Sequence, residues 1–352
     1  MHPSTWVGVE VAKDTGEDDD ASSATASQAN GSTGAPRRRL RTMRVVAVDL
    51  SHNNLDGRLP PNLHSLSVMT RLDLSGNLLG GPLPDSLTRM ERLTHLCLRS
   101  NAITGNLPPC IGDLSALVDL DVSMCRMTGK LPSEFKYLDA LEALDLSHNA
   151  FTGPLANTMC GATALTALRL HGNKLTGALP SRLSDLSSLE TLNLSCNAFT
   201  GELHALAALP EIRSAQLQHN RFDGRLAAVG DLSSLTLLYV HGNALSGPIP
   251  PAIGDCAALR FLNLQDNNLR GHVPREVTRL EALRVFLVAG NSKLKPPYPV
   301  ELGHLLGRLV DFSGCDPDWP SNDLAPPRAF TPTRYYRRFV LAPHLGLNSL
   351  GA

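Results

Sequence analysis

Residues 144–155 read "LDLSHNAFTGPL", and this stretch contains the main parts of a unit that recurs along the chain. Leu144 and Leu146 alternate with polar residues, which is the period of a strand with one buried face. Asn149 follows the strand, and Gly153 marks a bend. The same pattern runs from "VDLSHNNLDGRLP" at 48–60 to "LNLQDNNLRGHVP" at 262–274. Self-similarity of this kind predicts a repeat architecture.

The asparagine position sets the period of the repeat. It falls at Asn53, Asn77, Asn101, Cys125, Asn149, Asn173, Asn197, Asn220, Asn243, Asn267, Asn291 and Cys315. Successive positions are 24 residues apart, except for two steps of 23 residues into Asn220 and Asn243. One repeat cannot bury its own leucines, so neighbouring repeats must stack around a continuous core. We therefore predict an α/β solenoid over residues 44–316, a right-handed superhelix of about 12 repeats with a parallel β-sheet on its concave face.

Asparagine and glycine have separate roles in this unit. An asparagine amide both donates and accepts, so a column of asparagines can satisfy backbone groups where the chain leaves each strand. Cys125 and Cys315 interrupt the column, and a thiol is a weak donor, so these two rungs are expected to be poorer. The glycines suit a bend with an unusual backbone angle; they are Gly57, Gly81, Gly105, Gly129, Gly153, Gly177, Gly201, Gly224, Gly247 and Gly271.

Composition excludes several classes of protein. The chain has 352 residues and a formal net charge of -1, so no overall field attracts nucleic acid or an anionic membrane. No apolar run is long enough to span a membrane, and the first thirty residues lack the apolar core of a secretory signal. The seven cysteines form no CxxC pair, which favours free structural thiols over a zinc site or a disulfide framework. Partner choice must therefore come from local patches.

The flanks lack the period. Residues 1–12 are predicted to form an N-terminal cap strand, residues 13–43 a disordered inserted loop, and residues 317–352 a C-terminal cap and tail with Trp319 as the lid. The basic run Arg37–Arg41 fits a solvated linker better than a nuclear-import signal. The cluster Arg334–Phe339 mixes cations with aromatics. It could stack on single-stranded nucleic acid or pack against the solenoid, and the neutral net charge favours packing.

A search for catalytic chemistry finds little. Asp121 and Asp145 occupy the same exposed strand position in adjacent repeats, but Asp49 and Asp73 occupy it too, so a repeat-consensus residue is the simpler explanation. A flat, wet strand surface is not expected to raise a carboxylate pKa as an acid catalyst requires. Neighbouring His219 and His241 suggest a weak or pH-sensitive contact. We predict no catalytic residue, no metal and no cofactor, and hence no enzyme.

The motifs "LDLSHNAFTGPL" and "LSGPIPPAIGDCAAL" resemble the plant-type leucine-rich repeat family. That family includes the ectodomains of receptor-like kinases and receptor-like proteins and the polygalacturonase-inhibiting proteins, and similar repeats occur in protozoan surface antigens. The resemblance covers residues 44–316 and implies the solenoid, not a particular ligand. Family ectodomains often begin with W-x-G-V-x-C. Here Trp6, Gly8 and Val9 match, whereas Thr5 and Val11 stand where cysteines are expected.

The outward strand residues change character at the sixth repeat. Asp and Ser predominate in repeats one, two, four and five, which we interpret as solubility filler. From repeat six to repeat ten, long amide, aromatic and imidazole side chains replace them, and such residue types are enriched at interfaces. The predicted partner-binding residues are Arg169, His171, Asn193, Gln216, Gln218, His219, Tyr239, His241, Phe261, Asn263, Gln265 and Asp266.

These patterns predict a non-enzymatic, monomeric leucine-rich repeat protein that binds a protein or peptide through its concave strand face, with no nucleic acid and no transmembrane segment. The missing cap cysteines favour a reducing, cytoplasmic location. The alternatives are a receptor-like or secreted ectodomain that recognises a peptide or glycan, with its signal and anchor outside this sequence, and a polygalacturonase-inhibitor-like protein.

Overall fold

The computed structural model describes residues 9–13, 43–226, 229–296, 299 and 309–311. The chain divides into two units, Met1–Cys315 and Asp316–Ala352, and every described residue belongs to the first. Trp6, Cys315, Trp319, the basic run Arg37–Arg41 and the cluster Arg334–Phe339 lie outside the described residues. So do residues 14–42 of the predicted inserted loop.

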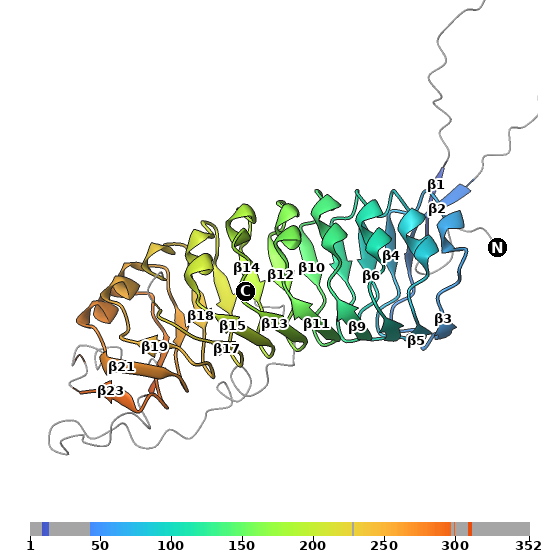
Figure 1. Ribbon diagram of the computed structural model, residues 1–352. Coiled ribbons are helices and arrows are strands. Elements are labelled where there is room, and N and C mark those ends of the chain that lie inside the picture. Colours follow the sequence, from blue (N-terminus) through green and yellow to red (C-terminus); the bar gives the residue numbers. More distant parts are fainter. Residues whose placement is uncertain (1–8, 14–42, 227–228, 297–298, 300–308, 312–352) are drawn as a thin grey trace, which may run out of the picture. The chain divides into compact units, whose positions relative to one another are not determined.

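The main feature of the first unit is a 13-stranded sheet. Its strands, in spatial order, are β1 (Val9–Lys13), β2 (Met43–Asp49), β4 (Arg71–Asp73), β6 (His95–Cys97), β8 (Asp119–Asp121), β10 (Ala143–Asp145), β12 (Ala167–Arg169), β14 (Thr191–Asn193), β16 (Ser214–Gln216), β18 (Leu237–Tyr239), β20 (Phe261–Asn263), β22 (Val285–Leu287) and β24 (Leu309–Asp311). From β2 onward each repeat adds one parallel strand, as Figure 1 shows. Twelve repeats therefore stack in sequence order, as predicted.

Two smaller sheets lie on another side of the solenoid, after the bend at the ladder asparagine. The first has eight strands, β3 (Asp56–Arg58), β5 (Leu78–Gly81), β7 (Ala102–Gly105), β9 (Arg126–Lys130), β11 (Ala150–Pro154), β13 (Lys174–Gly177), β15 (Ala198–Gly201) and β17 (Arg221–Phe222). The second has three, β19 (Ser246–Gly247), β21 (Asn268–His272) and β23 (Lys293–Lys295). Together we call these strands the side sheets.

Short 3-10 helices complete the first ten repeats on the convex side. They are η2 (Leu63–Ser65), η3 (Asp85–Arg89), η4 (Pro109–Asp113), η5 (Ser133–Tyr137), η6 (Asn157–Gly161), η7 (Leu183–Asp185), η8 (His204–Ala208), η9 (Val229–Asp231), η10 (Pro251–Asp255) and η11 (Arg275–Arg279). The helical part of the predicted α/β class is thus built from single tight turns. The two repeats that are one residue shorter lose that residue at this part, next to η8 and η9, so the strand register survives.

The core is one continuous cluster of inward side chains. Leu144 and Leu146 are fully buried, and the equivalent residues of the neighbouring repeats stack on them through in-register pairs such as Leu144 with Leu120 and Leu168. Phe199 and Phe222 stack with ring centroids 6.0 Å apart. Each strand therefore depends on both neighbours for burial, which is the reason that a single repeat cannot fold alone.

The asparagine column joins each repeat to the one before it. Asn77 Nδ2 donates to the carbonyl of Leu50 at 2.9 Å and to that of Leu74 at 2.8 Å. Its Oδ1 accepts the N–H groups of Asn53 and Leu55 at 3.0 and 2.9 Å. The same pattern recurs up to Asn291. The prediction that these amides satisfy the backbone at the turn is confirmed.

Cys125 is the poor rung that the sequence predicts. Its thiol donates to the carbonyl of Leu98 at 3.4 Å, and it has no amide oxygen to offer. At the equivalent rung, Asn149 Oδ1 accepts the N–H of Met127 at 2.9 Å. Ile103 precedes Cys125 by 22 residues, as Met127 precedes Asn149. There the Ile103 N–H meets the Cys125 sulfur, a weak acceptor, in place of an amide oxygen.

The ten predicted glycines all have positive φ, between +75° and +113°. A side chain is strained in this region, so the bend requires glycine.

At the N-terminal edge of the main sheet, β1 pairs antiparallel with β2. Val9 is opposite Val48, and the register shifts between Glu10 and Val11. The strand thus occupies residues 9–13, where the sequence predicts a cap strand at 1–12.

We expect Cys125→Asn to stabilise the solenoid. The new amide oxygen would accept the Ile103 N–H and complete the column, which should raise the free energy of unfolding by about 1 kcal/mol. Urea denaturation of the full-length parent and variant measures the change in the free energy of unfolding. The matched control is Asn149→Cys, which should lower the free energy of unfolding by about 1 to 3 kcal/mol because it strands the Met127 N–H. A destabilised Cys125→Asn variant would contradict the role assigned to the column.

Candidate functional site

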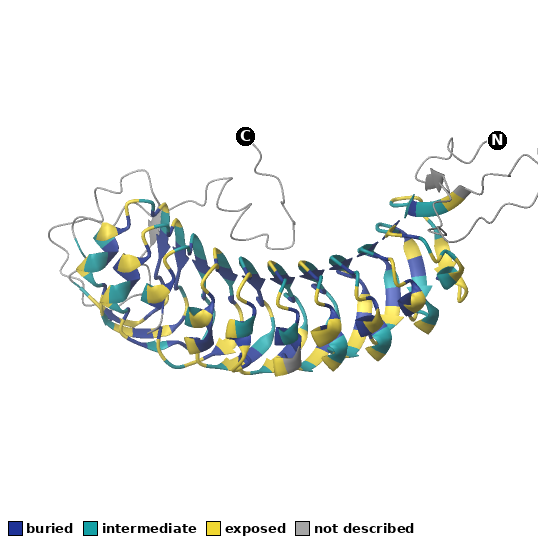
Figure 2. Cartoon of the chain, turned by 90° about the horizontal axis from the view of Figure 1, so that it is seen from above, coloured by how far each residue is buried: buried dark blue, intermediate teal, exposed yellow. Residues whose placement is uncertain are grey.

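The concave face consists of four columns of outward side chains that run along the solenoid. In repeat five the first to fourth columns are represented by Ala143, Asp145, Ser147 and His148, the residues six, four, two and one before the ladder Asn149. Parallel, in-register pairing places equivalent residues side by side. Figure 2 shows the curvature that makes this sheet the concave side. Each repeat therefore contributes one residue to each of the four columns.

The second column contains a hydrogen-bonding device that the sequence interpretation missed. Asp145 Oδ1 accepts the N–H of Ser147 at 2.9 Å and its hydroxyl at 2.6 Å. Asp49, Asp73 and Asp121 accept the equivalent N–H groups. The interpretation of these Asp and Ser residues as solubility filler was wrong, because the carboxylates satisfy the backbone at the strand end.

Two of the predicted partner-binding residues share this structural role. Asn193 Oδ1 accepts the N–H of Ser195 at 3.1 Å, and Asn263 Oδ1 accepts that of Gln265 at 3.1 Å. Asn193 and Asn263 are only 9% and 1% exposed, and Gln218 is 6% exposed. These three residues were predicted as surface contacts, and the structure corrects that: they lie in the floor of the face and offer a partner little surface.

The other nine predicted residues keep accessible side chains on the face. Arg169, Gln216 and Tyr239 lie in the second column, His171, His241 and Gln265 in the third, His219 and Asp266 in the fourth, and Phe261 in the first. Asn193 Nδ2 lies 3.4 Å from Gln216 Oε1, which links repeats seven and eight. The Tyr239 ring meets that of His241 edge-on, with centroids 6.0 Å apart. The structure therefore brings these residues to one side of the sheet.

An apolar stripe in the first column was not predicted. Leu237 of β18 is paired with Phe261 of β20, which is paired with Val285 of β22, and all three side chains are half-buried. In β8, β4 and β6 the same column holds Asp119, Arg71 and His95. The signal was present in the sequence as apolar residues six positions before three successive ladder asparagines. With the neighbouring Tyr239, this stripe is the most apolar part of the concave face.

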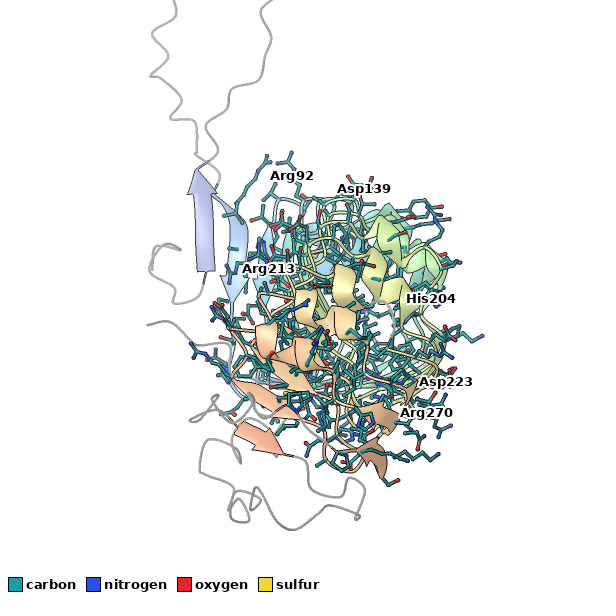
Figure 3. The ribbon with its side chains drawn as sticks, turned by 90° about the vertical axis from the view of Figure 1, so that its left-hand side faces the viewer. Arg92, Asp139, His204, Arg213, Asp223 and Arg270 are labelled. Atoms are coloured by element: carbon teal, nitrogen blue, oxygen red, sulfur yellow. The ribbon has the colours of Figure 1, made fainter. Side chains whose placement is uncertain are left out.

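Arginines border the stripe. The residues just before the first column in β20 and β22 are Arg260 and Arg284, both exposed, and the Arg284 N–H donates to the Arg260 carbonyl at 2.8 Å. Arg213, labelled in Figure 3, has the same place before β16 and forms an exposed ion pair with Glu190, Nε to Oε2 3.4 Å. The C-terminal half of the face therefore combines apolar side chains with a basic border, whereas the second column of the N-terminal half is mainly acidic.

Two histidine pairs, which we call the histidine clasps, lie on this face. The rings of His148 and His171 meet edge-on with centroids 4.8 Å apart, and those of His219 and His241 do so at 4.9 Å. In both clasps the first histidine has positive φ and its ring lies over the glycine of the next repeat. A Cβ added at Gly172 would come within 2.8 Å of His148 Nδ1. The glycine therefore provides the space that the clasp requires.

Burial keeps the inner histidine of each clasp neutral. It lowers the pKa of His171 to about 4 and that of His241 to about 4, with the partner histidines acting in the same direction. Asp145 opposes the shift at His171. The Nδ1 atoms of His171 and His241 are buried without a hydrogen-bond partner, so a proton there would gain no acceptor. The predicted His219 and His241 contact is confirmed, and a second pair was not foreseen.

Carboxylates in the acidic half also shift. Burial raises the pKa of Asp119 and that of Asp121, and Asp145 raises both further by repulsion. These two carboxylates are therefore perturbed in the upward direction by burial and by a like charge in the next repeat. Hydrogen bonds from Ser123 and the charge of Arg99, 4.0 Å from Asp121, oppose the shift at Asp121. Within the described ranges, no group of three His, Cys, Asp or Glu side chains is placed to hold a metal ion.

The clasps predict a pH-dependent stability. An unfolded histidine titrates near pH 6.5 and the folded ones near 4, so the unfolded state binds protons first as the pH falls. The histidines should leave the free energy of unfolding at its full value above about pH 6.5. They should lower it as the pH falls toward 4, by about 2 kcal/mol for each histidine at about pH 5.

Urea midpoints at about pH 7.5 and pH 5 measure this dependence. His171→Gln with His241→Gln should flatten the dependence relative to the parent, and the exposed His204→Gln should not. Asp119 and Asp121 are unchanged in all variants, so the difference isolates the clasps. Equal pH slopes in the parent and the double variant would contradict the assignment.

Comparisons with known proteins agree with this architecture. A family model described as "Leucine rich repeat" matches residues 163–222, and one described as "Leucine Rich Repeat" matches residues 44–66, 69–90, 92–114, 234–256 and 258–280. No curated protein gives a significant match to the sequence. Of the described helices, none has the length and apolar character needed to cross a bilayer.

Several solved structures are similar over most of the chain. A TDR receptor is 30% identical with a TM-score of 0.65, and the alignment covers 76% of this chain and 51% of that one. The Arabidopsis receptor kinase HAESA ectodomain, in complex with an IDA peptide hormone, is 27% identical with a TM-score of 0.69, covering 76% and 45%. The plant peptide hormone receptor RGFR1 in complex with RGF2 is 28% identical with a TM-score of 0.63, covering 74% and 46%.

This chain thus spans about half the length of those receptor chains. The agreement extends from the repeat consensus to the stacked sheet and its concave face. The chain contains leucine-rich repeats, and these repeats resemble those of plant receptor-kinase ectodomains.

Proposed function

We propose that this protein binds a polypeptide partner through the concave face of repeats six to eleven and has no catalytic activity of its own. The observation that carries the proposal is the apolar stripe Leu237, Phe261 and Val285, which lies next to Tyr239 and inside a border of arginines. Aromatic anchors surrounded by polar groups are the usual composition of interface hot spots. A solenoid strand face also offers one contact from each repeat along an extended partner.

The comparisons support this proposal in a general way. Two of the similar structures are receptor complexes, the plant peptide hormone receptor RGFR1 with RGF2 and the HAESA ectodomain with an IDA peptide hormone. Identity of 27–28% supports the architecture rather than the same ligand. The expected partner is therefore a polypeptide that binds the concave face, and its sequence is not implied by these relatives. The nine accessible predicted residues remain its contact set, together with Leu237 and Val285.

The contact set can be tested while the partner is still unidentified. A photo-crosslinking amino acid at position 265, on the third column, should capture a polypeptide from the native cell, and the same probe at position 136, on convex η5, should not. With the captured partner purified, Tyr239→Ala and Phe261→Ala should each weaken its binding by about 1 to 3 kcal/mol. The matched control is Lys130→Ala, which lies on the side sheets. Unchanged affinity in both aromatic variants would remove the proposal.

We also propose a cell-surface or secreted location. The similar structures include receptor ectodomains, and the predicted cytoplasmic location finds no support in the comparisons. Labelling of intact cells with a membrane-impermeant biotin reagent, followed by detection of the epitope-tagged full-length gene product, measures the location. The expected result is labelling equal to that of a surface marker and absent from a cytosolic marker. Labelling only after lysis would contradict this location.

A further inference from the structure

A second charged surface lies on the side sheets, separate from the concave face. It consists of Arg225, Arg270, His272, Lys293 and Lys295, which we call the basic strip; all five residues are exposed. In Figure 3 the labelled Arg270 lies at the opposite corner of the solenoid from Arg213, which borders the concave face. The strip is therefore independent of the surface proposed above.

Strand pairing sets the geometry of the strip. In the parallel pair β21 and β23, Arg270 is opposite Lys293 and His272 is opposite Lys295. The alternate residues Leu269 and Leu294 are fully buried, so the basic side chains share the outer face. His272 Nδ1 lies 3.2 Å from the Lys295 carbonyl, which holds the ring close to β23.

Arg225 extends the strip by one repeat. It forms a bridge with Ser246, which is paired with Asn268 of β21. Its stem lies over Gly247, where an added Cβ would be 3.3 Å from Arg225 Cγ. Asp223, exposed two residues before Arg225, is the acidic border on that side.

The pairing of like charges is unfavourable for the free protein. Like charges directly opposite one another in a sheet destabilise it. Among the described residues, the ion pairs involve other basic residues, such as Arg279 with Asp255, and none includes Arg225, Arg270, Lys293 or Lys295. Strands β21 and β23 contain no acidic residue. The strip therefore holds uncompensated positive charge on a chain whose formal net charge is -1.

Other repeats show that the positions do not require cations. The outward residue three after the ladder asparagine is threonine in five successive repeats, Thr104, Thr128, Thr152, Thr176 and Thr200. The Thr152 hydroxyl donates to the Gly129 carbonyl at 3.3 Å, so a neutral residue fits this site well. The position holds Arg270 in repeat ten. Among the described repeats, this position therefore holds a cation in repeat ten alone.

The chemistry of the strip indicates the class of partner. Strands β21 and β23 contain no Trp, Tyr or Phe on which nucleic acid bases could stack, and their two leucines are buried rather than available to a membrane. Alternate outward residues of a strand are about 6.8 Å apart, the same spacing as alternate side chains of an extended polypeptide. We infer that the basic strip binds an extended acidic segment of a polypeptide, whose carboxylates pair with Arg270, Lys293 and Lys295.

Fluorescence anisotropy of a labelled oligoglutamate peptide, titrated with the protein at low and moderate salt, tests this inference. The parent should bind at low salt and lose affinity as salt is added, because exposed ion pairs are screened. Lys293→Gln with Lys295→Gln should bind about tenfold more weakly, since two exposed ion pairs are lost. The matched control is Lys130→Gln with Lys174→Gln, which removes the same charge from β9 and β13, where the two lysines flank Thr152.

Three further measurements decide the outcome. Thermal unfolding of Lys293→Gln with Lys295→Gln should be unchanged or improved, which separates lost binding from lost folding. Tyr239→Ala should retain oligoglutamate binding. The test of the basic strip is therefore separate from the test of partner binding on the concave face, and either proposal can be overturned while the other stands. Equal weakening in the two lysine variants, absence of binding to the parent, or tighter binding of an oligouronate or a single-stranded oligonucleotide than of oligoglutamate would each overturn the inference.

Discussion

The amide column at the end of each main-sheet strand is the constraint on which the rest of the solenoid depends. Every repeat turns sharply there, and the turn leaves backbone donors and acceptors buried inside the stack. One asparagine satisfies groups of two successive repeats at once, as Asn77 does for Leu50, Leu74, Asn53 and Leu55. An unsatisfied buried backbone group costs about 1 to 3 kcal/mol, so the column fixes the register of each repeat on its predecessor.

Because the register is fixed, the positions of a repeat fall into two groups, those that maintain the fold and those that face outward and can vary. Leucines, the asparagine, the bend glycine and the second-column Asp or Asn serve the backbone and the core. The remaining outward positions are placed with the same regularity but are free to vary, so a functional surface arises wherever several of them change together. The stripe around Phe261 and the basic strip around Arg270 are two such places, on different sides of the same repeats. The histidine clasps are a third, and there a glycine in one repeat makes room for a side chain of another.

Predictions from the sequence were confirmed where the role of a residue follows from its own chemistry. The glycine bends and the weak rung at Cys125 each follow from the properties of single residues. They failed where a residue's role depends on a neighbour in space. Asp145 was interpreted as filler because its bond to Ser147 requires the strand-end geometry, and Asn193 and Asn263 were taken as contacts for the same reason. The stripe of Leu237, Phe261 and Val285 was missed because its members are about one repeat apart in the chain.

By itself, the sequence determined the period, the fold class, the number of repeats and the face on which each side chain lies, because a strand alternates and a stacked repeat must bury its leucines. Tertiary structure alone decided how deep each side chain sits and what it meets across the gap between repeats. Those quantities set the lowered pKa of His171, the raised pKa of Asp121 and the opposition of Arg270 to Lys293. The physical reason is that burial and charge coupling act over a few ångströms in space, across residues that a full repeat of chain separates.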